Sequence, residues 1–415
     1  MKNKKKYIAI VTSFMGVKSG YFHVARVLID QLSKNFDKIY LINTQNLRFF
    51  PKFARSVYME EDLGENDFKS SDIPKNFILF NPKNTKEFSD FLKDKEILVI
   101  NNFNKHFFDL PIQMIVKKLK IQQVQISYSG RAMSGSTQKM SLNHILKTVV
   151  FFLNQSFFKK VTVLLSNLGI TPKLDIRFMS DKEVYDSIIK DKFKNFLFKK
   201  KLLWAKEIKL VNSMAYDLML ENRYTTSEDY IVHLDASLNH RHEVELRGIW
   251  PKEKIIKHYY YLEKFLKKLS KEFNKEVIVT IHPGYDLEEH QSYLKDFKIL
   301  KYKTSEYIYK AFLVTAFDSS AVTEAVLLKK RLLGVTSNYM SQNEINHAKV
   351  NPKRFGYPSL NTEKDYNFNK EELLEKLNNS ISNYDKHINK YHCITPNKKG
   401  TEEIIRTIKT EFFIN

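Results

Sequence analysis

The chain has 415 residues, of which 68 are Lys or Arg and 47 are Asp or Glu, giving a formal net charge of +21. Its mean hydropathy of −0.41 indicates a globular protein, and its length predicts two domains because one core rarely grows this large. A single cysteine, Cys393, excludes an internal disulfide and a cysteine-based zinc site, and it favours a cytosolic protein. We expect neither a signal peptide nor a membrane span, since no window approaches about 20 apolar residues.

The positive charge needs an explanation, and three partners fit it: nucleic acid, an anionic membrane face, or anionic small molecules such as nucleotide sugars. Zinc fingers, an aromatic-and-basic RNP-like stretch, a GXXG loop and a recognition-helix pair are all missing from the sequence, so we expect no nucleic-acid partner. A compositionally biased genome is the alternative explanation, because lysine, asparagine and aromatic residues are abundant while only 11 glycines occur.

The first half of the chain alternates between strand and helix patterns. A β-branched segment at 7–14 leads through a glycine-containing turn at 16–20 into an amphipathic helix at 22–33. Alternation of this kind predicts a parallel sheet with helices on both faces, and ligands then approach the carboxyl ends of the strands. Further strands are expected at 38–42, 77–80, 96–101 and 123–128, and the rim they form would carry residues 18–21, 101–104 and 129–131.

Residues 139–170 differ from the rest of this predicted domain, which spans 1–215. Phe152, Phe157 and Phe158 crowd a helical stretch together with Lys159 and Lys160. A basic helix rich in aromatic residues is typical of a membrane interface. The alternative is that this segment packs on the sheet or against a dimer partner.

The second half begins a new α/β series, predicted as a domain spanning 225–395. Strands are expected at 229–235, 276–281, 312–317 and 331–335, with helices at 254–273, 320–330 and 371–391. The last of these helices has leucine and isoleucine spaced for one apolar face. A terminal helix within 396–415 is expected to pack back on the first domain.

Two strand ends in the second domain carry the strongest functional signal. One strand ends at His282-Pro283, and the next ends at Asp318-Ser319-Ser320 before a helix containing Glu324. Hydroxyl residues at a helix start suit a phosphate, and Glu324, one turn later, could accept hydrogen bonds from ribose hydroxyls. The alternatives are a plain strand terminator for His282-Pro283, helix caps for the serines and a solvated glutamate.

Two doubly wound domains with a nucleotide-type site in the second resemble the α/β GT-B glycosyltransferases, whose two Rossmann-like domains face a cleft. His282-Pro283 followed by Ser319-Ser320 is similar to the HP and SS motifs of bacterial sialyltransferases, polysialyltransferases and Kdo transferases that build capsule and lipopolysaccharide. The resemblance covers roughly residues 225–345. It implies that His282, Pro283, Ser319, Ser320 and Glu324 hold a CMP-linked sugar donor, with no other cofactor and no metal.

The sequence departs from those families at the group that activates the acceptor. They follow a strand of the first domain with a carboxylate pair and a glycine, but here Tyr128 and Ser129 precede Gly130. An unperturbed Tyr or Ser is a poor base near neutral pH, so another residue must remove the acceptor proton or the donor and mechanism differ. We expect His23 or Asp235 in this role. Other rim candidates are His106 and Asp109, with Lys18, Ser19 and Arg131 as weaker anion-binding candidates.

The function predicted is transfer of an acidic sugar, such as a nonulosonate or Kdo, onto a bacterial surface glycan or lipid-linked glycan. The enzyme would be cytoplasmic and peripheral at the inner membrane, where its charge would meet an anionic surface. A UDP-sugar 2-epimerase or a UDP- or GDP-hexose transferase of the same fold is the nearest alternative. A noncatalytic nucleic-acid-binding or membrane-binding protein is the alternative from a different class.

Overall fold

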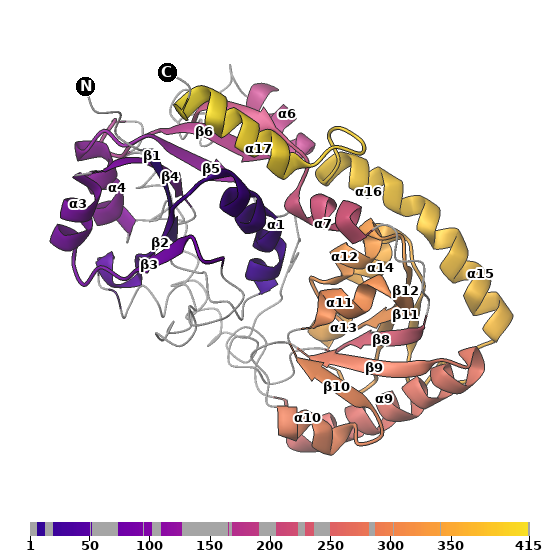
Figure 1. Cartoon of the computed structure of the whole chain (residues 1–415). Helices are drawn as coiled ribbons and strands as arrows, with labels where there is room; N and C mark the ends of the chain where they lie inside the picture. Colours follow the sequence, from indigo (N-terminus) through magenta and orange to yellow (C-terminus); the bar gives the residue numbers. More distant parts are fainter. Residues whose placement is uncertain are drawn as a thin grey trace. The chain divides into compact units, whose positions relative to one another are not determined.

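The computed structural model describes two compact units of the chain. Unit 1 comprises the described residues of Met1–Gly130, Lys139–Asp217 and Tyr391–Asn415, and unit 2 those of Leu218–Lys390. Figure 1 shows the elements of each unit in sequence colours. The described residues are 6–12, 20–49, 51, 74–93, 95–101, 109–126, 165, 168–190, 205–222, 229–235, 250–281, 287–301, 303–340 and 342–413.

Unit 1 is built on a parallel sheet of seven described strands in the order β3-β2-β1-β4-β5-β6-β7. The sequence order reverses between β1 and β4, as in a doubly wound fold. The strands are β1 (Lys6–Thr12), β2 (Ile39–Asn43), β3 (Phe77–Phe80), β4 (Glu96–Asn101), β5 (Gln123–Ile126), β6 (Leu174–Met179) and β7 (Ala205–Leu210).

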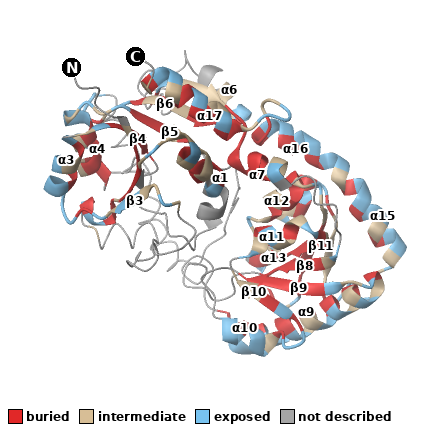
Figure 2. Cartoon of the chain, in the orientation of Figure 1, coloured by how far each residue is buried: buried red, intermediate tan, exposed pale blue. Residues whose placement is uncertain are grey.

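Side-chain alternation along these strands separates two apolar layers in unit 1. Ile8 and Ile10 of β1 pack in one cluster with α1 and α17, whereas Ala9 packs in the other cluster with α3 and α4. The sheet is therefore covered on both faces, and Figure 2 shows its central strands, such as β4, as buried. The helices assigned to this unit are α1 (Gly20–Asn35), α3 (Thr85–Lys93), α4 (Leu110–Lys118), α6 (Lys182–Lys190) and α17 (Gly400–Ile408), and α7 (Met214–Asn222) spans the boundary to unit 2.

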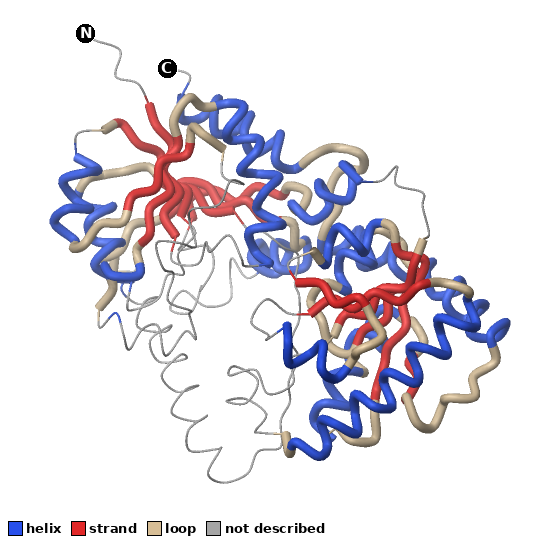
Figure 3. The backbone as a smooth tube through the Cα atoms, turned by 60° about the horizontal axis from the view of Figure 1, so that its bottom comes forward, coloured by secondary structure: helices blue, strands red, loops and turns tan. Residues whose placement is uncertain are grey.

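Unit 2 repeats this plan with six described parallel strands in the order β10-β9-β8-β11-β12-β13. Helix α9 (Lys252–Phe273) lies on one face of this sheet, and helices α11 (Thr304–Tyr309) and α12 (Val322–Leu327) lie on the other (Figure 1). Figure 3 shows the red strands of each unit with blue helices around them. The strands are β8 (Tyr230–Leu234), β9 (Glu276–Ile281), β10 (Lys298–Lys301), β11 (Ala311–Ala316), β12 (Arg331–Thr336) and β13 (Ser359–Asn361).

The core of unit 2 forms because its central strands are apolar on both faces and its long helix is apolar on one. The stripe Leu262, Phe265, Leu266 and Leu269 of α9 packs on Val277 and Val279 of β9, as expected for a buried parallel sheet. The helices of unit 2 are α9 (Lys252–Phe273), α10 (Leu287–Tyr293), α11 (Thr304–Tyr309), α12 (Val322–Leu327), α13 (Gln342–Ala348), α14 (Val350–Phe355), α15 (Lys370–Ser380) and α16 (Tyr384–Tyr391, whose last residue belongs to unit 1).

Two helices expected from the sequence are shorter than predicted. The helix expected at 371–391 is divided by a 3-10 turn, Ile381–Asn383, into α15 and α16. The helix expected at 320–330 is only α12, because Ala321 is its N-cap and Lys329 adopts a left-handed backbone with φ 52°. Strands β6, β7, β10 and β13 were not expected; β10 and β13 are only four and three residues long, and β7 carries exposed charged side chains.

Candidate functional site

The candidate site of unit 2 lies at the carboxyl edge of its sheet, where the strand order reverses between β8 and β11. These neighbours pair in parallel, with His233 opposite Thr315 and Leu234 opposite Ala316. The segments that follow them, starting at Asp235 and at Phe317, therefore leave the sheet at the same edge. Open α/β sheets bind their ligands at such a reversal point.

Asp235 is the centre of a buried polar network at this edge. Its Oδ2 atom accepts a hydrogen bond of 2.9 Å from the Tyr259 hydroxyl and lies 3.3 Å from His290 Nε2. Its Oδ1 atom lies 3.6 Å from Nε2 of His233, and Nδ1 of His233 is 2.8 Å from the Thr315 hydroxyl. The Asp235 side chain is 1% exposed, so it points toward α9 and α10 rather than into solvent.

The network holds its groups in defined charge states. Burial alone would raise the pKa of Asp235, but the hydrogen bonds and positive charge of His233 and His290 outweigh it and hold that pKa well below its usual range. His258, the residue before Tyr259 in α9, is buried, and burial lowers its pKa to about 4 although the charge of Asp235 opposes the change. Asp235 is thus an ionised group of low basicity, and His258 is neutral at pH 7.

The segment Asp318-Ser319-Ser320 forms a turn before α12 and does not cap the helix with a side chain. The Ser319 hydroxyl accepts a hydrogen bond of 3.3 Å from the backbone N–H of Ala321, and Ser320 is exposed. Ala321 occupies the N-cap position without a side-chain bond. Neither serine occupies the N-cap position of α12, and their role in donor binding stays a prediction.

The structure adds His347 to the residues at this edge. Its Nδ1 atom lies 3.8 Å from Oδ2 of Asp318, and both side chains are largely or partly buried. His347 belongs to α13, in the segment that follows β12. Because β12 is the neighbour of β11 in the sheet, this segment brings His347 to the end of β11. The spacing between Asp318 and His347 matches no motif, so the sequence alone does not identify His347 as a site residue.

Glu324 lies in the first turn of α12, and its carboxyl group is oriented toward α11. Its Oε2 atom is buried without a hydrogen-bond partner. Burial raises its pKa to about 7, and a hydrogen bond with Ser305 opposes this increase. Tyr309 lies nearby, and burial together with the charges of Glu324 and Glu221 raises its pKa further above the ordinary value. Glu324 is consequently a carboxyl group that titrates near neutral pH.

Several predicted site residues lie outside the described part of the chain. These are His282 and Pro283, the weaker candidates Lys18, Ser19 and Arg131, the possible base His106, and the pair Tyr128 and Ser129. The backbone of His23 is described as part of α1, but its side chain is not. The roles proposed for these residues stay predictions.

Asp109 is described, and its surroundings argue against a role as general base. Its Oδ1 atom accepts a hydrogen bond of 2.8 Å from Arg48 Nε, and both side chains are fully buried. A carboxylate held in a buried ion pair is not accessible to an acceptor.

The described ranges hold no candidate metal site and no membrane-spanning helix. Within them, no group of three or more His, Cys, Asp or Glu residues has a geometry that could hold a metal ion, and this includes the Asp235 network. Among the helices that the structure describes, none is long and apolar enough to span a membrane.

No protein-family model matches this sequence, and no curated protein matches it. Among solved structures, a variant of the wall teichoic acid polymerase TagF soaked with CDPG is similar at 11% identity and a TM-score of 0.52, over 99% of this chain and 89% of that chain. MurG of Acinetobacter baumannii (10% identity, 98% and 100% coverage) and UDP-GlcNAc 2-epimerase of Methanocaldococcus jannaschii (12%, 98% and 99%) give TM-scores of only 0.43 and 0.45. The likeness to TagF shows a shared GT-B fold with two Rossmann-like domains.

Proposed function

We propose that this protein is a glycosyltransferase that binds a nucleotide-linked donor at the carboxyl edge of the unit 2 sheet. The observation that carries the proposal is the strand order β10-β9-β8-β11-β12-β13, because it brings Asp235 and the segment 318–320 to the two sides of one reversal point. A donor phosphate would be held by Ser319, Ser320 and the predicted ligand His282, with Pro283 ending its strand. Unit 1 would take the acceptor.

Glu324 is proposed to contact the donor ribose. Support comes from its position on α12 directly after the 318–320 turn and from its Oε2 atom, which has unused hydrogen-bonding capacity. With a pKa of about 7, the carboxyl can either donate or accept a hydrogen bond near neutral pH. Binding requires the ribose to reach this buried atom, so a ligand would have to displace its present packing against α11.

Asp235 is proposed to act in catalysis through its neighbours. A carboxylate with a lowered pKa is a weak base, so direct removal of the acceptor proton by Asp235 is unfavourable. It can instead fix the orientation of the His290 ring, which also lies 3.1 Å from the Tyr259 hydroxyl through Nε2. This leaves His23 as the remaining proposed base.

The donor class is proposed to be an acidic sugar linked to CMP, destined for a bacterial surface glycan. Support comes from the order of the HP and SS motifs and from the net charge of +21, which suits an anionic donor and acceptor. The fold alone also fits UDP- or GDP-linked donors and an epimerase.

Calorimetric titration and thermal unfolding with CMP, UDP and GDP test this proposal. A nucleotide present at 100 times its Kd should stabilise the protein by about 2.7 kcal/mol. CMP should give the largest effect. The variant Ser319→Ala/Ser320→Ala should weaken CMP binding, whereas the control Ser382→Ala, which changes an exposed serine outside the proposed site, should not. Stabilisation by UDP or GDP alone would redirect the donor assignment. A protein that responds to none of the three would contradict the donor site.

A further inference from the structure

The outer face of α9 carries an exposed patch in which apolar and basic side chains alternate. We define the α9 patch as Ile256, Lys257, Tyr260, Tyr261, Lys264 and Lys268. Ile256 is 48% exposed and Tyr260 is 50% exposed, on successive turns of the helix. The opposite stripe of α9 is buried in the core of unit 2 and anchors the helix.

The charge of α9 is strongly positive. The helix carries seven lysines and three glutamates. Lys267 forms ion pairs with Glu263 and Asp296, and these pairs neutralise part of the negative charge on this surface. A surface with this excess of ammonium groups attracts an anionic partner.

The aromatic rings of the patch are already stacked by protein groups. Lys264 Nζ lies 4.3 Å from the ring centre of Tyr260, and Tyr261 stacks on Tyr339 at 5.5 Å. Lys268 Nζ lies 5.0 Å from the ring centre of Tyr366, another exposed tyrosine. Nucleobases and sugars bind to aromatic residues through open ring faces, and each of these contacts occupies one face of a ring. Ile256 and Tyr260 are each about half exposed, and the Lys264 ammonium group lies beside the Tyr260 ring.

We propose that the α9 patch docks the protein on an anionic membrane surface. Tyrosine rings are favoured at the level of lipid headgroups, and lysine stems lie along apolar surface while their ammonium groups reach lipid phosphates. Ile256 supplies an apolar group that can enter the boundary between headgroups and acyl chains. This inference is independent of the proposed donor site, because it uses none of those residues.

Vesicle sedimentation tests the inference. The full-length protein should bind vesicles of phosphatidylcholine with phosphatidylglycerol and should bind pure phosphatidylcholine vesicles weakly. The variant Lys257→Gln/Lys264→Gln/Lys268→Gln should lower the partition coefficient roughly a hundredfold, since each lysine near such a surface contributes about fivefold. The variant Ile256→Ser/Tyr260→Ser keeps the charge and should also reduce binding.

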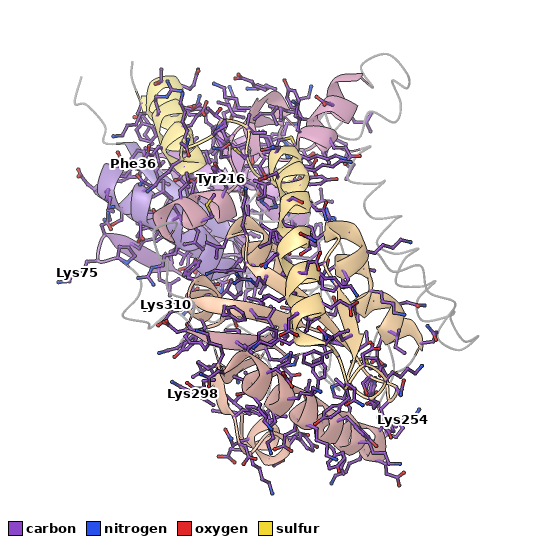
Figure 4. The ribbon with its side chains drawn as sticks, turned by 90° about the vertical axis from the view of Figure 1, so that its right-hand side faces the viewer. Phe36, Lys75, Tyr216, Lys254, Lys298 and Lys310 are labelled. Carbon is purple, nitrogen blue, oxygen red and sulfur yellow. The ribbon has the colours of Figure 1, made fainter. Side chains whose placement is uncertain are left out.

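The matched control is Lys298→Gln/Lys310→Gln/Lys353→Gln, which removes the same charge from exposed positions elsewhere in unit 2. Figure 4 shows Lys298 and Lys310 on the opposite side of the unit from Lys254, which marks the first turn of α9. Equal loss of binding in the control and the patch variant would overturn the inference, since net charge would then suffice. If the protein shows no detectable vesicle binding at low salt but binds a single-stranded oligonucleotide through the α9 patch, the inference is overturned and the patch is assigned to nucleic acid instead. Thermal unfolding of each variant confirms that it is folded.

Discussion

Removal of the Asp217 carboxylate should weaken the attachment of α17 to unit 1. Asp217, in α7, accepts three hydrogen bonds of 2.7 Å, from the backbone N–H of Gly400 and from the backbone N–H and hydroxyl of Thr401. These groups begin α17, whose N-cap residue Lys399 does not cap the helix with its side chain. A residue 183 positions earlier therefore supplies the cap that the helix itself lacks.

The cost of Asp217→Ala comes from the buried hydrogen-bond donors that lose their acceptor. Two backbone N–H groups and one hydroxyl would be left in a buried site, and an unsatisfied buried polar group costs about 1–3 kcal/mol. Part of this cost is offset, because the ionised Asp217 carboxylate is itself unfavourable in a buried site. Burial raises its pKa to about 6, although the hydrogen bonds from Thr401 and Gly400 oppose this increase. We expect a net loss of roughly 2–4 kcal/mol in unfolding free energy at pH 7.5.

Urea unfolding followed by circular dichroism measures this loss. Asp385→Ala is the matched control, because Asp385 is paired with Lys329 while both side chains are about half exposed, and such a pair contributes at most about 1 kcal/mol. If Asp217→Ala does not fold, Asp217→Asn provides a milder change that retains one acceptor oxygen. The reasoning is refuted if Asp217→Ala unfolds at the same urea concentration as Asp385→Ala.

Three further predictions concern stability. Gly400→Ala should cost at least about 2 kcal/mol in the same assay, because its Cβ would press against the carbonyl group of Asn212, 2.8 Å from the carbonyl carbon. His258 has a pKa lowered by burial, so the wild type should lose up to about 3 kcal/mol as pH falls from 6.5 to 4, and His258→Gln should reduce that loss; parallel curves would disprove the burial argument. Glu324 has a raised pKa, so its contribution is complete below about pH 4.5 and is lost as pH rises toward 7, and denaturation of Glu324→Gln should show a shallower decline between pH 5 and 8.

The sequence by itself determined the elements with strong periodicity and the architecture that they imply. Strand β9 has the predicted bounds, 276–281, because an uninterrupted β-branched run is favourable only in a buried strand. The alternation of strands and helices predicted two doubly wound domains, and both sheets have the parallel order of that fold. Short edge strands such as β10 and β13 carry too few residues to show a period.

Tertiary structure decided which side chains meet. Asp235 was predicted at a strand end, but its contacts with Tyr259 and His290 join segments 24 and 55 residues later, which no local pattern can reveal. His347 reaches Asp318 in the same way. Local sequence fixes backbone preferences over a few residues, whereas the charge state of a buried carboxylate depends on groups that only the folded chain brings within hydrogen-bonding distance.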